Sequence, residues 1–192
     1  FSCRCGLCRS VAGNQKAHGS VMKRLLLCRH AKSSWQDGSL ADIDRPLNKR
    51  GKQNAPEMGR RLRRLGLRPD LVISSPARRA RHTAKLLAKE CGVPRKKIHL
   101  IPEVYDSYPA KLLQLIQGLD NRWNTVLIVG HNPEVTILAN LLADLGLDNV
   151  PTGGIVALDF EVGAWSEVGE LEGALNFFEY PRKESGTIEG SN

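Results

Sequence analysis

The feature of this sequence that most constrains its fold is the alternation of short apolar runs with longer amphipathic segments. Each run has the length of a β-strand, and the segments between them repeat apolar residues at the spacing of one helix face. Strands that alternate with helices build a parallel or mixed sheet covered by helices on both faces. The sequence therefore predicts a three-layer α/β/α fold with a mostly parallel central sheet. The predicted strands are Lys23–Cys28, Asp70–Ser74, Ile98–Ile101, Thr125–Val129, Ile155–Phe160 and Leu175–Phe178.

Four helices are predicted between these strands. The first covers Asn48–Leu65, and its apolar face consists of Ala55, Met58, Leu62 and Leu65. Pro56 and Gly59 lie inside this segment and weaken the prediction of an unbroken helix. The second helix opens at Pro76, with apolar positions at Ala80, Ala84, Leu87 and Cys91. The remaining two are predicted over Pro109–Leu119 and Glu134–Leu145.

Length and composition fit one globular domain. The chain has 192 residues, of which 41% are hydrophobic and 25% charged, a balance that excludes wholly disordered, collagenous and coiled-coil proteins. No apolar run approaches the roughly 20 residues needed to span a bilayer, so we expect no membrane partner. One folded domain is expected over residues 22–181, after a disordered segment 1–21 and before a polar tail 182–192.

Residues 1–21 have an unusual composition for a folded segment. They include Arg4, Arg9 and Lys16 but no acidic residue and no continuous apolar stretch. This composition is typical of a transit peptide for an organelle, chloroplast or mitochondrion, and argues against a secretory signal. A cloning remnant is the alternative, and it would leave a cytoplasmic location as the expectation.

The five cysteines do not form the pattern of a disulfide framework. Cys28 and Cys91 lie within apolar patterns and are predicted to be core residues. The other three cluster near one histidine at the start of the chain, and four such side chains could ligate zinc. Their spacing matches no standard zinc finger, so we predict no metal site. These four residues are Cys3, Cys5, Cys8 and His18.

The charges are unevenly distributed along the chain. The net charge is +8, yet residues 22–97 hold 21 basic and 6 acidic residues, whereas residues 98–192 hold 4 basic and 14 acidic residues. Such an asymmetry creates a directional field that attracts anions. Nucleic acid, anionic membranes and phosphorylated substrates all fit this pattern, and so does a protein whose basic side chains are merely solvated.

Basic residues and histidines follow three of the predicted strands. Arg29 and His30 come after the first strand, Arg79 follows the second, and His131 follows the fourth. Ligands of such sheets bind beyond the carboxyl ends of the strands. An isolated histidine or arginine is more often structural, but this joint placement predicts one shared site.

The chemistry that suits such a group is phosphoryl transfer. Arginine forks bind phosphate oxygens in a bidentate manner, and the start of the helix at Pro76 would direct N–H groups at the same anion. A neutral imidazole can attack phosphorus and form a phosphohistidine, while a second imidazole stabilises the developing charge. No metal ion and no cofactor is needed for this chemistry.

Competing motifs are incomplete. Asn48–Gln53 contains Gly-Lys but lacks the flanking residues of a P-loop. The basic residues between Arg60 and Arg64 would suit nucleic acid, but aromatic residues are only 5% of the chain and none alternates with them. We therefore expect no nucleic-acid partner.

Three motifs resemble those of the histidine phosphatase superfamily. They are Leu27–Lys32 (L-C-R-H-A-K), Ser75–Thr83 (S-P-x-x-R-A-x-x-T) and Val129–Pro133 (V-G-H-N-P), in the family's order between Met22 and Phe178. The compact pattern R-H-A-K-S-x-W is most similar to SixA-type phosphohistidine phosphatases. The resemblance implies a phosphoglycerate mutase-like fold and a catalytic domain over residues 22–181.

The resemblance also implies a role for each matching residue. His30 would be the nucleophile, Arg29 and Arg79 would bind the phosphoryl group, and His131 would stabilise it during transfer. Arg79, not Arg78, matches the motif because it directly precedes its alanine. Further residues are expected near the substrate, although a solvated surface role is equally open for the first two: Lys32, Ser33 and Asn132.

Mutase-like relatives use a glutamate as general acid, and this sequence has no secure equivalent. Glu103 and Asp106 are the candidates. An alkoxide leaving group needs a positioned proton donor, whereas the imidazole of a phosphohistidine can leave as a neutral molecule. We therefore predict a monomeric, metal-independent phosphatase whose partner is a phosphorylated protein and which cleaves phosphohistidine. The alternatives are a phosphatase of a small phosphorylated metabolite and a binding module that has lost catalysis.

Overall fold

Six strands form one central sheet in the order β3-β2-β4-β1-β5-β6 in the computed structural model, which describes residues 22–181. β4 pairs in parallel with both β1 and β2, β2 pairs in parallel with β3, and β5 is antiparallel to its neighbours β1 and β6. The predicted mostly parallel sheet is confirmed. The strands are β1 Lys23–Arg29, β2 Leu71–Ser74, β3 Ile98–Leu100, β4 Thr125–Gly130, β5 Ile155–Phe160 and β6 Ala174–Glu179.

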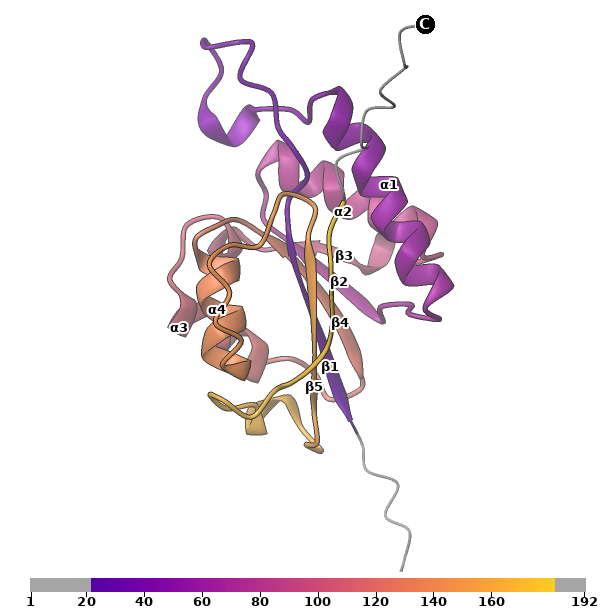
Figure 1. The fold of residues 1–192 in the computed structure, drawn as a ribbon, viewed down its shortest axis with the longest axis vertical. Coiled ribbons are helices and arrows are strands. Elements are labelled where there is room, and N and C mark those ends of the chain that lie inside the picture. The colour runs from indigo at the N-terminus through magenta and orange to yellow at the C-terminus, as the bar shows by residue number, and fades with distance from the viewer. Residues whose placement is uncertain (1–21, 182–192) are drawn as a thin grey trace, which may run out of the picture.

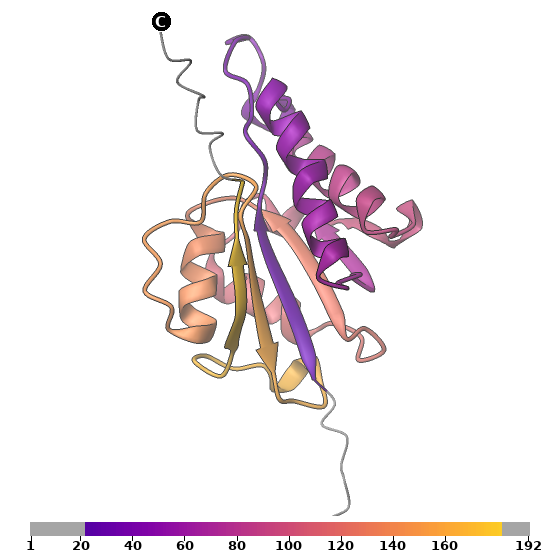
Figure 2. The ribbon, with the colours of Figure 1, turned by 45° about the vertical axis from the view of Figure 1, so that its right-hand side comes forward.

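Helices cover both faces of this sheet, as the three-layer prediction requires (Figures 1 and 2). α1 and α2 lie on one side, and α3 and α4 lie on the other. No helix among residues 22–181 is long and apolar enough to cross a membrane. The predictions for residues 1–21 and 182–192 fall outside the described residues. The helices are α1 Lys49–Arg64, α2 Arg78–Glu90, α3 Pro109–Gln117 and α4 Glu134–Ala143.

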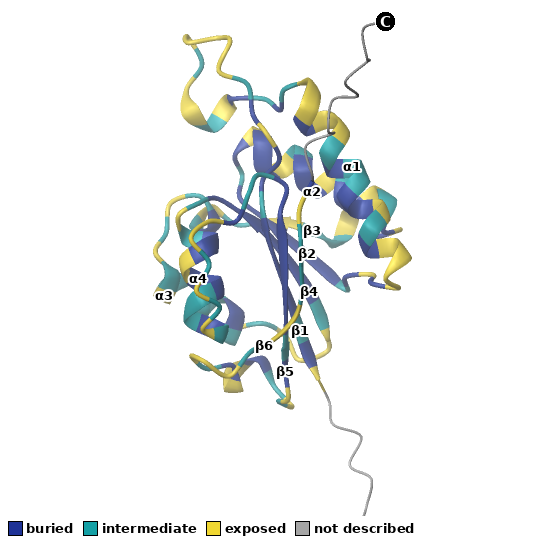
Figure 3. Ribbon diagram, viewed as in Figure 1, coloured by how far each residue is buried: buried dark blue, intermediate teal, exposed yellow. Residues whose placement is uncertain are grey.

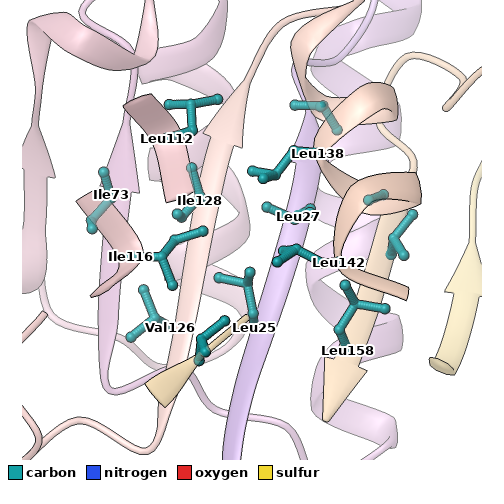
Figure 4. Close-up of a cluster of buried hydrophobic side chains, with 14 of the residues drawn as sticks. Leu25, Leu27, Ile73, Leu112, Ile116, Val126, Ile128, Leu138, Leu142 and Leu158 are labelled. Carbon is teal, nitrogen blue, oxygen red and sulfur yellow. The ribbon is translucent and has the colours of Figure 1, made fainter. Parts of the chain in front are cut away.

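Alternate residues of the central strands point into two separate apolar layers. In β1, Leu25 and Leu27 pack with α3 and α4, whereas Leu26 and Cys28 pack with α1 and α2. The first of these layers is the cluster shown in Figure 4. Because both faces of β1 are covered, its sequence is a continuous apolar run. Burial also raises the pKa of the Cys28 thiol to about 12, so this cysteine behaves as a core residue.

Helix α1 is unbroken, although Pro56 and Gly59 lie within it. Gly59 is buried where α1 crosses α2, and a Cβ atom there would lie 2.7 Å from Cβ of Glu90 and 2.9 Å from the carbonyl oxygen of Leu87. The glycine therefore permits the close approach of the two helices. The prediction that Leu65 belongs to the apolar face was wrong: Leu65 follows the last helical residue and is 55% exposed. Figure 3 shows both buried and exposed residues along α1.

The carboxyl ends of β1, β2 and β4 are aligned at one edge of the sheet. Arg29 is paired with Gly130, and Ser74 with Val129. The ladder continues one residue further, because the amide of His30 donates to the carbonyl of Gly130 and that of Ser75 donates to Val129, both at 3.0 Å. His30, Ser75 and His131 are thus the first residues beyond three neighbouring strands.

The packing of Gly59 generates a test of the contact between α1 and α2. Gly59→Ala should destabilise the protein by about 1–3 kcal/mol, because the cost of overpacking outweighs the gain in helix propensity. Gly38→Ala is the control, since a Cβ atom at Gly38 meets nothing within 4 Å. Urea unfolding followed by circular dichroism measures both variants. An unchanged or raised midpoint for Gly59→Ala would contradict the close helix contact.

Candidate active site

His30 is buried directly after β1, and its tautomer follows from its hydrogen bonds. Nδ1 lies 2.8 Å from the carbonyl oxygen of Ala31, which can only accept, so Nδ1 carries the proton. Nε2 then holds the lone pair and accepts from Nε of Arg79 at 3.3 Å. Burial, together with the charges of Arg79, Arg29 and Arg45, lowers the pKa of His30 to about 4. The side chain is a neutral imidazole with its lone pair at Nε2.

His131 lies beside His30, with the two ring centroids 5.0 Å apart. Its Nε2 is 2.8 Å from Oγ of Ser75, and its Nδ1 is 3.3 Å from Nη2 of Arg79. Because a guanidinium can only donate, Nδ1 accepts and Nε2 donates to Ser75. Burial and the positive charges nearby lower the pKa of His131 to about 3. Ser75 therefore holds this second neutral imidazole in place.

Arg79 connects the two histidines. It lies in the first turn of α2, is only 6% exposed and donates to both rings. Arg78 precedes it and is exposed, because adjacent helical residues point about 100° apart at ~3.6 residues per turn. The structure thus brings Arg79, and not Arg78, to the histidines.

Arg29, the last residue of β1, and Asn132, the second residue after β4, share a hydrogen-bond acceptor. Nη1 of Arg29 and Nδ2 of Asn132 both donate to Oδ1 of Asn149, each at 2.9 Å. Nε of Arg29 and Oδ1 of Asn132 are buried and have no hydrogen-bond partner among the described residues. Nε of Arg29 is therefore an unpaired donor on a guanidinium group whose Nη1 is held in place by Asn149.

Within residues 22–181, the remaining predicted residues make no side-chain hydrogen bond with His30 or His131. Lys32 is exposed, and the buried hydroxyl of Ser33 accepts from Nη2 of Arg45 at 2.9 Å. Among residues 22–181, neither Glu103 nor Asp106 makes a hydrogen bond or ion pair with the histidines or arginines described above. The same residues contain no group of three or more His, Cys, Asp and Glu side chains that could hold a metal ion.

The carboxylate that the structure does bring to the site is Asp42, in the segment between β1 and α1. Oδ2 of Asp42 accepts from Nη2 of Arg79 at 2.8 Å and from the hydroxyl of Tyr105 at 3.0 Å. Oδ1 accepts from Nη1 of Arg45 at 2.8 Å. Although desolvation opposes ionisation, these hydrogen bonds and the charge of Arg79 lower the pKa of Asp42 to about 2.

Sequence analysis missed Asp42, Arg45 and Tyr105. The ring of Tyr105 stands edge-on to His131, with centroids 5.5 Å apart. The guanidinium of Arg45 stacks on the exposed ring of Trp35. The segment between β1 and α1 projects above the sheet in Figure 1. Its short helical turn, Asp42–Asp44, contacts α2, where Asp42 pairs with Arg79. In the sequence, the signal that could have identified Asp42 was its place in the segment that follows the carboxyl end of β1.

Comparison with known proteins agrees with the motifs. Residues 25–106 match the model of the histidine phosphatase superfamily, branch 1. The chain is 32% identical to an uncharacterized chloroplastic protein of Arabidopsis thaliana, over 80% of this chain and 74% of the relative. The chain belongs to the histidine phosphatase superfamily. It is also 35% identical to an uncharacterized protein of Mycobacterium tuberculosis, over 80% of this chain and 99% of the relative.

Solved structures of the superfamily have the same fold. A SixA candidate phosphohistidine phosphatase from Agrobacterium tumefaciens superposes with a TM-score of 0.71 at 28% identity, over 83% of this chain and 98% of the other. The protein histidine phosphatase SixA complexed with tungstate superposes with a TM-score of 0.69 at 21% identity, over 82% and 96%. The expected phosphoglycerate mutase-like histidine phosphatase fold is confirmed.

The burial of the two histidines generates a test by titration. As the pH falls from 6.5, His30 should become half-protonated only near pH 4, and His131 only near pH 3. Long-range ¹H–¹⁵N NMR spectra report the protonation of each ring. Arg79→Gln should raise the pKa of His30, because it removes a positive charge that disfavours the imidazolium. Titration of His30 near 6.5 in the unsubstituted protein would contradict the described environment.

The register of α2 generates a second test. Arg79→Ala should lower turnover of a phosphorylated substrate by at least about 100-fold, as expected for the loss of a donor that faces developing charge. With a small substrate such as free phosphohistidine, Arg78→Ala should change turnover by less than about threefold, because it alters an exposed side chain. Steady-state kinetics of the two folded variants measure the contrast. A larger loss in Arg78→Ala would reverse the assignment of the two arginines.

Proposed function

We propose that this protein is a phosphatase that acts through a phosphohistidine intermediate on His30 and removes phosphate from phosphohistidine in proteins. Its family supports phosphatase activity on phosphorylated substrates. Two features together support phosphohistidine as the substrate. His30 is neutral and surrounded by cations, and Asp42, the carboxylate that contacts Arg79, is ionised.

The tautomer of His30 suits nucleophilic attack. The lone pair on Nε2 forms the bond to phosphorus, while the bond between phosphorus and the leaving nitrogen breaks. The positive charge that develops on the His30 ring is shared with Nδ1–H, which donates to the carbonyl of Ala31 at 2.8 Å. Arg79 reaches the same nitrogen and so lies where the phosphoryl oxygens would be.

Charge stabilisation would come from side chains instead of a metal ion. Arg79 and the free Nε of Arg29 offer donors to the phosphoryl oxygens. A phosphoryl dianion between the rings would raise the pKa of His131, because an opposite charge favours the imidazolium. His131 would then donate from Nδ1 to the phosphoryl group, while Ser75 still holds its Nε2.

The ionised state of Asp42 decides whether this residue can protonate the leaving group. Arg45, Arg79 and Tyr105 hold its pKa at about 2, so at neutral pH it has no proton to give. An alkoxide would leave without assistance, which is slow, whereas a ring-protonated phosphohistidine releases a neutral imidazole. This favours a phosphoramidate substrate over an alkyl phosphomonoester.

Hydrolysis of the intermediate completes the cycle. A water molecule attacks phosphorus, its oxygen becomes part of inorganic phosphate, and the bond to Nε2 of His30 breaks. One proton of the water passes to the phosphate, and His30 regains its lone pair. The hydrogen bond to Ala31 keeps the proton on Nδ1 throughout.

An organelle location is proposed together with this activity. The basic, acid-free composition of residues 1–21 supports a chloroplast or a mitochondrion, and the chloroplastic relative in Arabidopsis thaliana favours the chloroplast. Import of a fluorescent fusion of residues 1–21 into isolated chloroplasts tests this location.

Rapid quenching tests the covalent step. Mixing the protein with a phosphohistidine-bearing protein in buffer that contains a chelator should trap an acid-labile, base-stable phosphate on His30. Mass spectrometry locates the group, and His30→Asn should abolish it. The kcat/KM for phosphohistidine should exceed that for sugar phosphates or phosphoglycerate. Phosphate on His131, dependence on one metal, or faster hydrolysis of the alkyl esters would each overturn part of the proposal.

A further inference from the structure

A cationic hollow lies beside the residues that follow His30. It has a volume of about 690 Å³ and is formed by both ends of the segment between β1 and α1 and by the N-terminal ends of α1 and α2. Its basic lining residues are Lys49, Arg50, Lys52 and Arg78, and no Asp or Glu lines it. The hollow adjoins the site through the chain itself, because Ser34 lines it four residues after His30 and Arg78 directly precedes Arg79.

The positive charge continues from this hollow along α2. Partial burial and the charges of Lys52, Lys85, Arg78 and Arg81 together lower the pKa of His82, so these cations surround one side chain. A second hollow of about 630 Å³ begins at His82 and Lys85. It extends to Arg68, Lys89 and Arg95 and is also lined by no Asp or Glu.

These cations differ from the arginines at the other end of α1. Arg60, Arg61 and Arg64 all form ion pairs with Glu57, and Arg61 also pairs with Glu179. Among residues 22–181, by contrast, no ion pair involves a basic residue that lines either hollow. The hollow beside the site and the surface that continues from it along α2 therefore carry uncompensated positive charge.

We propose that this surface, from Lys49 across Arg81 to Arg95, binds an acidic face of the phosphorylated protein that is dephosphorylated at His30. The inference rests on the proposed function and names how its substrate is recognised. Exposed charges that lack partners attract an oppositely charged face, speed association and orient the encounter. A protein bound along α1 and α2 would have its phosphorylated side chain at the edge of the sheet.

The same surface fits single-stranded nucleic acid less well. Such ligands are usually bound by aromatic side chains that stack with the bases, alternating with cations. No aromatic side chain other than the His82 imidazole lines either hollow. The surface offers charge and shape without a stacking platform, which suits clustered carboxylates on a folded partner.

The test compares two sets of charge reversals that change the net charge equally. The docking variant carries Lys52→Glu, Arg81→Glu and Lys85→Glu, all at exposed positions on α1 and α2. The control variant carries Arg63→Glu, Arg64→Glu and Arg122→Glu, at exposed positions that line neither hollow. The probes are two single-histidine protein domains, one acidic and one basic, both phosphorylated chemically with phosphoramidate. Free phosphohistidine serves as the small substrate.

The docking variant should lose at least about tenfold in kcat/KM for the acidic domain, a loss that disappears at high salt. Its kcat/KM for free phosphohistidine should match that of the control variant within about twofold. Equal rates of both variants on the acidic domain would overturn the docking proposal and leave the proposed function intact. Failure of the unsubstituted protein to hydrolyse any phosphohistidine probe would instead overturn the proposed function.

Binding separates the two proposals further. In a His30→Asn background, fluorescence anisotropy should show the acidic domain bound more tightly than the basic one, and the docking reversals should remove that preference. The measurement does not depend on turnover. Tighter binding of a labelled oligonucleotide than of the acidic domain, lost with the same three reversals, would assign the surface to nucleic acid and overturn the docking proposal.

Discussion

The parallel pairing of β4 with β1 and β2 is the constraint on which the candidate site depends. This register aligns the last residues of three strands, so that His30, Ser75 and His131 occur side by side although they are far apart in the chain. Covering both faces of the sheet with helices makes the pairing rigid, because each central strand is buried on both sides. A shift of one residue in either pairing would turn one histidine to the opposite face.

Electrostatics at this edge follow from burial as much as from charge. Burial disfavours the imidazolium form, and the neighbouring guanidinium groups disfavour it further, so both histidines are neutral. The guanidinium of Arg79 is in turn neutralised by Asp42. A nucleophile that keeps its lone pair and a cation that stays fixed are two consequences of the same small network. A dianionic phosphoryl group entering the network would shift its balance toward a protonated His131.

Arginine serves two purposes in the layer formed by α1 and α2. Near the carboxyl end of α1, Arg60, Arg61 and Arg64 are held by Glu57, and such exposed pairs contribute little to stability. The basic residues that line the two hollows, by contrast, form no ion pair within residues 22–181. A field that concentrates near the entrance of a site affects encounter rates more than it affects folding. The charge asymmetry of the sequence is thereby related to a defined surface of the molecule.

The local sequence determined much of the secondary structure and part of the candidate site. Apolar runs of strand length, the helix periodicities and the strand-end positions of His30, Arg79 and His131 were all readable from the sequence, because they depend on residues close together in the chain. The tertiary structure alone decided what depends on distant neighbours. Gly59 disfavours a helix locally, yet it permits the contact between α1 and α2. Asp42 lies in an irregular segment without periodicity, and only the folding of that segment onto α2 brings its carboxylate to Arg79 and holds it ionised.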